Sequence, residues 1–326
     1  MEFHLGFQPK ISPVKITHQE PLLLIGSCFS EHIGQRLSDL KFQVQSNPFG
    51  IVFNPSSIEK SLNRIIDKNY FNDNDVFEKD NFWFSLDAHS SVFADSKENL
   101  IELLNTKIDE WNLLLNTASF LTITLGSAFA YKNNKKNKIV ANCHKLPQEL
   151  FEKLLLESQD ILPNFKILIE KLLKKNPKLH ILFTVSPVKH LREGLVENNL
   201  SKSILIQSIH QVIKHNNNCH YFPAYEIVND DLRDYRFYEA DMAHPNKLAI
   251  DYVWDKFSDV FFNETTTFIN EQLVQLNQAY RHRFLNEKSE ASTKFKMQFY
   301  QKCLAFQSKF PSIDLSKELL HFTNYE

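Results

Sequence analysis

Several kinds of residue and segment are scarce in this 326-residue sequence. Its four cysteines are far apart and form no Cys-x-x-Cys pair, which argues against a zinc ribbon or a thioredoxin-like centre. A domain of this size needs no disulfide bonds. No apolar run approaches the roughly 18 residues of a membrane span, and the first residues do not read as a secretion signal. We therefore expect a cytoplasmic protein that does not enter a membrane.

An excess of charge is also missing. Lysine and arginine number 37 against 39 aspartates and glutamates, so the formal net charge is −2. The basic runs at residues 135–136 and 174–175 are short, which argues against nucleic acid as a partner. With 43% hydrophobic and 23% charged residues, the composition is that of an ordinary globular protein.

The segment that organises the chain is residues 22–34. Four apolar residues, 22–25, suit a short strand buried on both faces, and Gly26 and Ser27 interrupt them. Apolar residues then recur at helical spacing over residues 28–40. Strand, tight turn and helix is how α/β proteins place a nucleophile, because the helix directs its first N–H groups at an anion formed there.

Two readings of this turn stay open. The hydroxyl of Ser27 could attack a substrate, or it could only cap the helix that follows. Cys28 is a competing nucleophile, since a helix N-terminus lowers the pKa of a thiol. A small buried apolar residue is the other role open to that cysteine.

Strands and helices alternate over residues 20–262, which predicts an α/β fold with a doubly wound, flavodoxin-like parallel sheet. We expect β-hairpins inserted at residues 76–94 and 129–141, and a long helix over residues 147–175 that breaks near Pro163. The strands of the sheet are expected at residues 22–25, 42–44, 120–125, 179–185 and 219–222.

The sequence changes character near residue 262. Beyond it no strand pattern remains, and the chain is polar and helix-like. We therefore divide it into an α/β domain, residues 1–262, and a helical C-terminal extension, residues 263–326. The extension is expected to be an appendage or a homo-oligomer contact rather than a catalytic part.

Polar residues follow several predicted strands, where open parallel sheets bind ligands. They include Ser27, a loop around Gly50 between two Asn-Pro steps, and the pair Asp241 and His244. Three residues apart in a turn, the carboxylate can reach one imidazole nitrogen and leave the other for a serine hydroxyl. Gly50 either brings a backbone N–H close to a ligand or serves only as a turn residue.

The motif Gly26-Ser27-Cys28-Phe29 resembles the signature of the GSCFA family, which is related to the SGNH (GDSL-like) hydrolases. Residues 47–50, 142–145, 184–190 and 230–245 support this resemblance, which covers roughly residues 20–260. It implies an SGNH-hydrolase-like fold with Ser27 as nucleophile, His244 as base and Asp241 as the residue that orients the base.

The resemblance also implies that the Gly50 N–H helps to hold the oxyanion. SGNH enzymes add an asparagine amide after the third strand, where this chain has Gly126-Ser127-Ala128. The next asparagine that returns to the same edge is Asn142, which either completes the oxyanion hole or only caps a turn. His144 would shape the pocket beside it.

The function expected from these motifs is hydrolysis or transfer of an acyl group. The substrate would be a small-molecule ester, an acylated carbohydrate among the options, with no cofactor and no metal. A metal-assisted phosphoesterase using His144, His190 and His244 is an alternative, although no compact ligand motif such as His-Glu-x-x-His occurs. A non-catalytic binding module on the same fold is the third possibility.

Overall fold

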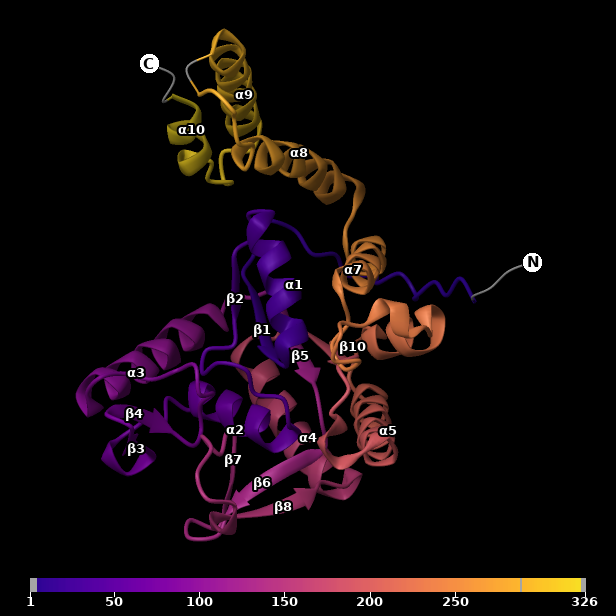
Figure 1. Cartoon of the computed structure of the whole chain (residues 1–326). Coiled ribbons are helices and arrows are strands. Elements are labelled where there is room, and N and C mark those ends of the chain that lie inside the picture. Colours follow the sequence, from indigo (N-terminus) through magenta and orange to yellow (C-terminus); the bar gives the residue numbers. More distant parts are fainter. Residues whose placement is uncertain (1–4, 288, 324–326) are drawn as a thin grey trace.

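Five parallel strands form the central sheet of the computed structural model, which describes residues 5–287 and 289–323 (Figure 1). Their order across the sheet is β10, β9, β5, β1, β2, so the chain winds first to one side of β1 and then to the other. This order confirms the flavodoxin-like, doubly wound prediction. The strands are β1 (Leu22–Gly26), β2 (Val44–Ser46), β5 (Phe120–Leu125), β9 (His180–Val185) and β10 (Cys219–Tyr221).

Helices cover both faces of the sheet. In β1 the side chains of Leu23 and Ile25 join one apolar core, and those of Leu22 and Leu24 join the other, as the two-residue period of a strand requires. The first core lies under α2 (Pro55–Ile66), α3 (Lys97–Leu114), α4 (Ser158–Lys175) and α5 (Leu195–Ile213). The second lies under α1 (Cys28–Asp39) and α7 (Lys247–Phe261).

Both predicted hairpins are present, and the second has gained a third strand. The strands β3 (Val76–Lys79) and β4 (Phe82–Ser85) pair, and β6 (Phe129–Asn133) pairs with both β7 (Lys138–Val140) and β8 (Phe151–Leu155). The helix expected from residue 147 is therefore wrong in its first part. It begins only at Ser158, and Pro163 lies inside it without ending it. The free edge of β6 recruits residues 151–155 as a strand despite their helical propensity.

Short helical turns connect these elements. They are η1 (Asp73–Asp75), η2 (Gln148–Leu150), η3 (Leu191–Glu193), α6 (Ala224–Glu226), the π-helix η4 (Ile227–Leu232) and η5 (Tyr235–Phe237). None of the helices that the structure describes is long and apolar enough to cross a bilayer.

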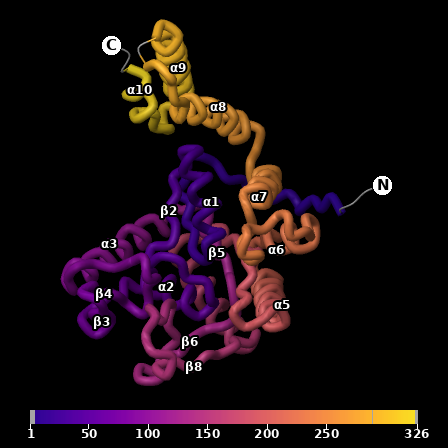
Figure 2. The backbone as a smooth tube through the Cα atoms, viewed as in Figure 1, coloured from indigo at the N-terminus to yellow at the C-terminus, as the bar shows by residue number. Residues whose placement is uncertain are grey.

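The C-terminal extension is helical, as expected. It consists of α8 (Glu264–Tyr280), α9 (Glu290–Lys309) and α10 (Ser316–Thr323), which lie together at one end of the molecule, beyond α1 and α7 (Figure 2). Asn277 donates a hydrogen bond of 2.5 Å to the Asp39 carbonyl, and Lys41 pairs with Glu318 at 2.7 Å. These contacts hold the extension against the C-terminal end of α1.

Candidate active site

Ser27 lies at the elbow between β1 and α1. Its hydroxyl oxygen accepts a hydrogen bond of 3.3 Å from the Phe29 N–H and so caps α1, while its own N–H donates to the Thr124 carbonyl at 3.2 Å. The residue is buried. The capping reading of Ser27 is thus present in the structure, and it places the hydroxyl beyond the carboxyl end of β1.

The glycine before the elbow is fixed by sterics. Gly26 has φ of +143°, and a Cβ there would overlap the Thr124 carbonyl group of the neighbouring strand. The Gly26 N–H donates to the side-chain oxygen of Asn47 at 2.8 Å. This asparagine, from the Asn-Pro-Phe-Gly motif, therefore ties the loop after β2 to the elbow.

Gly50 lies in that loop with φ of +74°, a conformation that favours glycine. Its N–H donates to the Asn47 carbonyl at 2.9 Å, and a Cβ would lie 2.5 Å from the Cβ of His89. The His89 N–H in turn donates to the Phe49 carbonyl at 2.8 Å. The segment after the β3–β4 hairpin thus clamps the loop, and the Gly50 N–H is engaged in a turn.

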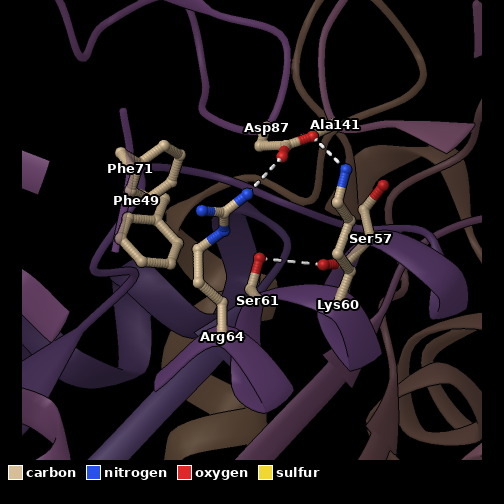
Figure 3. A pocket seen from close by; sticks show the side chains of 8 residues that line it. All are labelled: Phe49, Ser57, Lys60, Ser61, Arg64, Phe71, Asp87 and Ala141. Atoms are coloured by element: carbon tan, nitrogen blue, oxygen red, sulfur yellow. Dashed lines mark hydrogen bonds and ion pairs between the residues drawn. The ribbon is translucent and has the colours of Figure 1, made fainter. Parts of the chain in front are cut away.

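A charged cluster supports the loop from below (Figure 3). The Asp87 carboxylate accepts hydrogen bonds from Lys60 at 2.5 Å and from Arg64 at 3.1 Å, and the Arg64 guanidinium lies 3.9 Å from the centre of the Phe71 ring. Phe71 packs edge-on against Phe49. The void between these side chains measures about 10 Å³, the room of one water, so the cluster stabilises the loop rather than binding a substrate.

Asp241 and His244 form a hydrogen-bonded pair, as their spacing predicts. The two side chains meet at 2.6 Å between Oδ2 and Nδ1, and the other carboxylate oxygen accepts from the N–H groups of His244 and Ala243. Backbone hydrogen bonds, first that of His244, lower the pKa of Asp241 to about 2. The carboxylate favours the tautomer with its proton on Nδ1, which leaves Nε2 as the basic nitrogen.

The loop that carries this pair is held to the end of β9. The Ala243 carbonyl accepts a hydrogen bond of 3.0 Å from the Lys189 N–H, and the Lys189 ammonium lies 3.3 Å from the centre of the Tyr238 ring. Tyr238 pairs across the loop with Pro245. Asp241 and His244 nevertheless expose about half of their side chains, 50% and 53%.

Two further groups belong to this region, and only His190 was among the candidate residues of the sequence. Lys202 of α5 is fully buried, and its ammonium donates to the carbonyls of Gly126 at 2.5 Å and Ser186 at 2.7 Å. His190 follows β9, and its ring packs on Phe53. Burial lowers the pKa of His190 to about 3, and the charges of Lys202 and His244 add to the effect. The helical pattern around Lys202 gave no signal of burial, whereas the Ser-Pro-Val-Lys-His motif had marked His190.

Cys28 is a poor nucleophile in this environment. The thiol is partly buried, and burial, followed by the nearby Glu31 carboxylate, raises its pKa. These two effects outweigh the stabilising N–H groups of the helix N-terminus. A thiol that stays protonated favours Ser27 over Cys28 as the attacking residue.

Asn142 and His144 line a cleft of about 1250 Å³, and Phe53 and Asn54 also lie in its wall. The Asn142 side-chain oxygen accepts from the His144 N–H at 2.8 Å, and the buried His144 ring shares a hydrogen bond of 2.7 Å with the Ser85 carbonyl. Of these, Phe53 also touches His190. Other lining residues are Phe129, Tyr131, Gln148, Phe151, Lys153, Arg192, Glu193 and Glu197.

The structure thus joins some of the predicted site residues and not others. Asp241 bonds to His244, and Asn142 to His144. Within residues 5–287 and 289–323 no hydrogen bond links the Ser27 hydroxyl to His244, and none links Gly50 to Asn142. The described residues also include no group of three or more His, Cys, Asp or Glu side chains placed to hold a metal ion.

Comparisons with known proteins identify a family. The sequence model of the GSCFA family matches residues 21–257, and that of the GSCFA domain protein C-terminal domain matches residues 273–325. No curated protein matches the chain.

Three solved structures that resemble the chain are esterases by name. A carbohydrate esterase family 3 protein from Talaromyces cellulolyticus is 7% identical, with a TM-score of 0.36, over 80% of this chain and 99% of that one. An acetyl xylan esterase from the rumen bacterium Butyrivibrio proteoclasticus is 11% identical, with a TM-score of 0.38, over 75% and 64%. A family two carbohydrate esterase from Clostridium thermocellum, in complex with cellohexaose, is 11% identical, with a TM-score of 0.34, over 81% and 68%.

Proposed function

The chain belongs to the GSCFA family, and from that premise we propose that it is a serine hydrolase of ester bonds. Ser27 is the proposed nucleophile, His244 the base, and Asp241 the residue that orients the base. The observation that carries the proposal is the hydrogen bond of 2.6 Å between Asp241 and His244, in a loop held to Lys189 after the carboxyl end of β9, while Ser27 follows the carboxyl end of β1. A carboxylate that fixes one imidazole nitrogen leaves the other to accept a serine proton.

In the proposed reaction the Ser27 oxygen attacks the carbonyl carbon of the ester, and its proton passes to His244 Nε2. The tetrahedral intermediate collapses as the bond to the leaving alcohol breaks, and His244 returns the proton to the alcohol oxygen. Water, activated by the same imidazole, then releases the acid from the acyl-enzyme. In a transferase a second alcohol takes the place of water.

This reaction requires two adjustments at the site. The Ser27 hydroxyl must rotate away from the Phe29 N–H, a change between staggered rotamers. His244 Nε2 must also come within hydrogen-bond reach of the Ser27 hydroxyl, and a shift of its half-exposed loop on substrate binding would supply this. We propose Asn142 as a further contact to the substrate, supported by His144, and Gly50 as the residue that shapes the loop after β2, because its N–H is engaged in the turn.

The large cleft suggests the kind of alcohol that is released. Its walls combine the aromatic rings of Phe129, Tyr131 and Phe151 with the amides of Asn142 and Gln148. Aromatic faces and amides together suit a sugar, which has apolar ring faces and hydroxyl edges. We therefore propose a small acyl group on a carbohydrate as the substrate. A cytoplasmic location and association of copies through the C-terminal helices stay predictions.

A fluorophosphonate probe, which bonds covalently to activated serines, tests the nucleophile. We expect one adduct per chain on Ser27, because the elbow follows the carboxyl end of β1 and the loop of the Asp241–His244 pair is held after the carboxyl end of β9. Ser27→Ala should abolish labelling. Cys28→Ala, the matched control at the next position, should keep most of it.

The readout is mass mapping of the labelled peptide beside turnover of 4-nitrophenyl acetate, with and without a chelator. An adduct on Cys28 would overturn the assignment of the nucleophile. Activity that a chelator removes would favour the metal-assisted phosphoesterase. A folded protein without adduct or turnover would favour the binding module.

A further inference from the structure

We propose that His190 is a further catalytic residue, whose Nε2–H donates a hydrogen bond to the oxyanion of the reaction. This inference rests on the proposed ester hydrolysis. It gives a role to a side chain that the sequence marked only as one of three histidines in a metal-site alternative.

The first support is a buried polar atom without a partner. The Nε2 atom of His190 is enclosed, and no hydrogen-bond partner for it exists in the described part of the chain. The atom lies over the end of β5, where a Cβ on Gly126 would be 3.2 Å from it. Because nearly all buried polar groups in proteins are paired, a lone one beside a proposed active site indicates a partner that the substrate supplies.

The second support is the position of His190 relative to the nucleophile. Ser27 follows β1 and His190 follows β9, and these strands lie on either side of β5. The Ser27 N–H donates a hydrogen bond to the Thr124 carbonyl near the end of β5. The His190 imidazole faces Gly126, two residues further along the chain. A substrate carbonyl above the end of β5 would therefore be approached by the hydroxyl from one side and the imidazole from the other.

The third support is that three backbone donors near the elbow are already used. The Ser27 N–H donates to the Thr124 carbonyl, the Gly50 N–H to the Asn47 carbonyl and the Gly126 N–H to the Phe53 carbonyl. An oxyanion needs donors that are free and already in place. Among the groups facing Gly126, the imidazole of His190 has a nitrogen without a protein partner, which the substrate would reach as it opens the site.

The charge state of His190 suits a donor. The titratable groups whose charges act on it are Lys202 of α5 and His244 of the loop before α7, and the ring against which it packs, Phe53, is uncharged. Burial, followed by the charge of Lys202, disfavours a protonated imidazole, so the ring stays neutral and carries one N–H. The backbone N–H of His190 donates to the buried side chain of Asn198 at 2.8 Å, which anchors the residue.

Two substitutions at position 190 separate a donor from a packing residue. His190→Phe keeps a ring against Phe53 but has no donor, and His190→Gln returns an N–H near the position of Nε2. We expect His190→Phe to lower kcat for 4-nitrophenyl acetate roughly a hundredfold, the usual loss for one oxyanion donor, with KM within about twofold. The kcat of His190→Gln should be about tenfold higher than that of His190→Phe.

The matched control is His180→Gln. His180 is the first residue of the same strand, β9, so it lies at the end of the strand away from the candidate site. Its ring shares a hydrogen bond of 3.0 Å with His220. We expect this variant to keep kcat within about twofold. A trifluoromethyl ketone, which forms a hemiketal oxyanion on the serine, should bind the His190→Phe protein more weakly in the same proportion as kcat falls.

A measurement on the unmodified protein covers the case in which a variant fails to fold. With ¹⁵N-labelled histidine, the Nε2–H signal of His190 should move downfield when the ketone adduct forms. An unchanged signal, or a folded His190→Phe protein with kcat within threefold of the starting protein, overturns the role of His190. If Ser27 still takes the fluorophosphonate in that case, the proposed function stands. Loss of both labelling and turnover in the unmodified protein overturns the proposed function instead.

Discussion

Lys202 shows how the fold accepts a buried charge. The ammonium is enclosed, and the described residues provide two backbone carbonyls, of Gly126 and Ser186, rather than a carboxylate to pair with it. These carbonyls terminate β5 and β9, so the lysine joins the ends of two adjacent strands under the candidate site. Burial lowers its pKa to about 7. The cost of burying charge is thus reduced by release of the proton.

This pKa predicts how stability depends on pH. Between about pH 7 and the unfolded value of about 10.4, the unfolded chain holds a proton at Lys202 that the folded chain has lost. The free energy of unfolding should therefore rise with pH in this window, by at most about 1.4 kcal/mol per pH unit. The unfolding free energy of the Lys202→Met protein should lack this pH dependence. It should also be lower by an amount that does not vary with pH, because the two hydrogen bonds of the ammonium are lost.

Urea unfolding of both proteins at several pH values checks this prediction. The difference in unfolding free energy between the unmodified and the Lys202→Met protein should be flat below about pH 7 and grow above it. Subtracting the variant removes the titration of all other groups. Parallel curves up to pH 10 would show that Lys202 remains charged in the folded protein.

At the scale of elements, the close contact between β1 and β5 fixes the conformation of the elbow at Gly26 and Ser27. Gly26 has a positive φ and lies directly on Thr124, with a Cβ position 2.8 Å from the Thr124 backbone nitrogen and carbonyl carbon. Gly26→Ala must therefore separate the two strands. We expect a loss of about 3 kcal/mol or more in unfolding free energy, because backbone strain and a backbone clash add together.

Gly34→Ala is the control for this substitution. Gly34 lies in α1, where alanine is favoured over glycine by up to about 1 kcal/mol. The added methyl would overlap the rotatable hydroxyl of Ser46 and lie at ordinary contact distance from Leu24. Thermal and urea unfolding should show a change of less than about 1 kcal/mol. Equal losses of unfolding free energy at both positions would mean that the close approach of Gly26 to Thr124 does not specifically require glycine.

The order of strands and helices could be predicted because their apolar periods are strong. The strand β1, with five buried residues, and the helix α1, with apolar residues at helical spacing, lie where the sequence predicts them. Residues 151–155 could not be assigned correctly, because the edge of β6 that pairs with them is distant in sequence. Pairing across such distances overrides local propensity.

The candidate site was predictable only where its members are neighbours in the chain. Asp241 and His244 are three residues apart, so their hydrogen bond followed from spacing alone. The burial of Lys202 depends on how α5 is rotated against the sheet, and the unpartnered nitrogen of His190 depends on the packing of Phe53. Neither rotation nor packing is encoded in a local pattern.

At the scale of the whole molecule, the C-terminal helices continue the apolar core that lies under α1 and α7. Leu273 and Leu276 of α8 belong to the same buried cluster as Cys303 and Phe306 of α9 and Phe322 of α10. A chain that ends after α8 would expose this face of the helix. Exposed apolar patches of this kind promote aggregation.

We therefore expect the solubility of a truncated chain to depend on where the chain is cut more than on how many residues are removed. A chain of residues 1–262 should fold, with a lower Tm because contacts such as that of Thr266 with the Ile16 carbonyl are lost, and should keep labelling at Ser27. A chain of residues 1–286 should aggregate. Size-exclusion chromatography and fluorophosphonate labelling of both measure this. An unfolded 1–262 chain would show that the boundary at residue 262 is wrong.

The proposed nucleophile and its base lie at opposite ends of the sheet domain in sequence: Ser27 follows the first strand, and His244 comes after the last. A ribosome therefore completes the elbow early and supplies the base only when almost the whole domain has been synthesised. Under the proposed mechanism, a nascent chain cannot hydrolyse esters while it is still growing. A product of premature termination between β5 and Asp241 would carry the nucleophile and remain catalytically silent, so that the onset of activity coincides with completion of the fold.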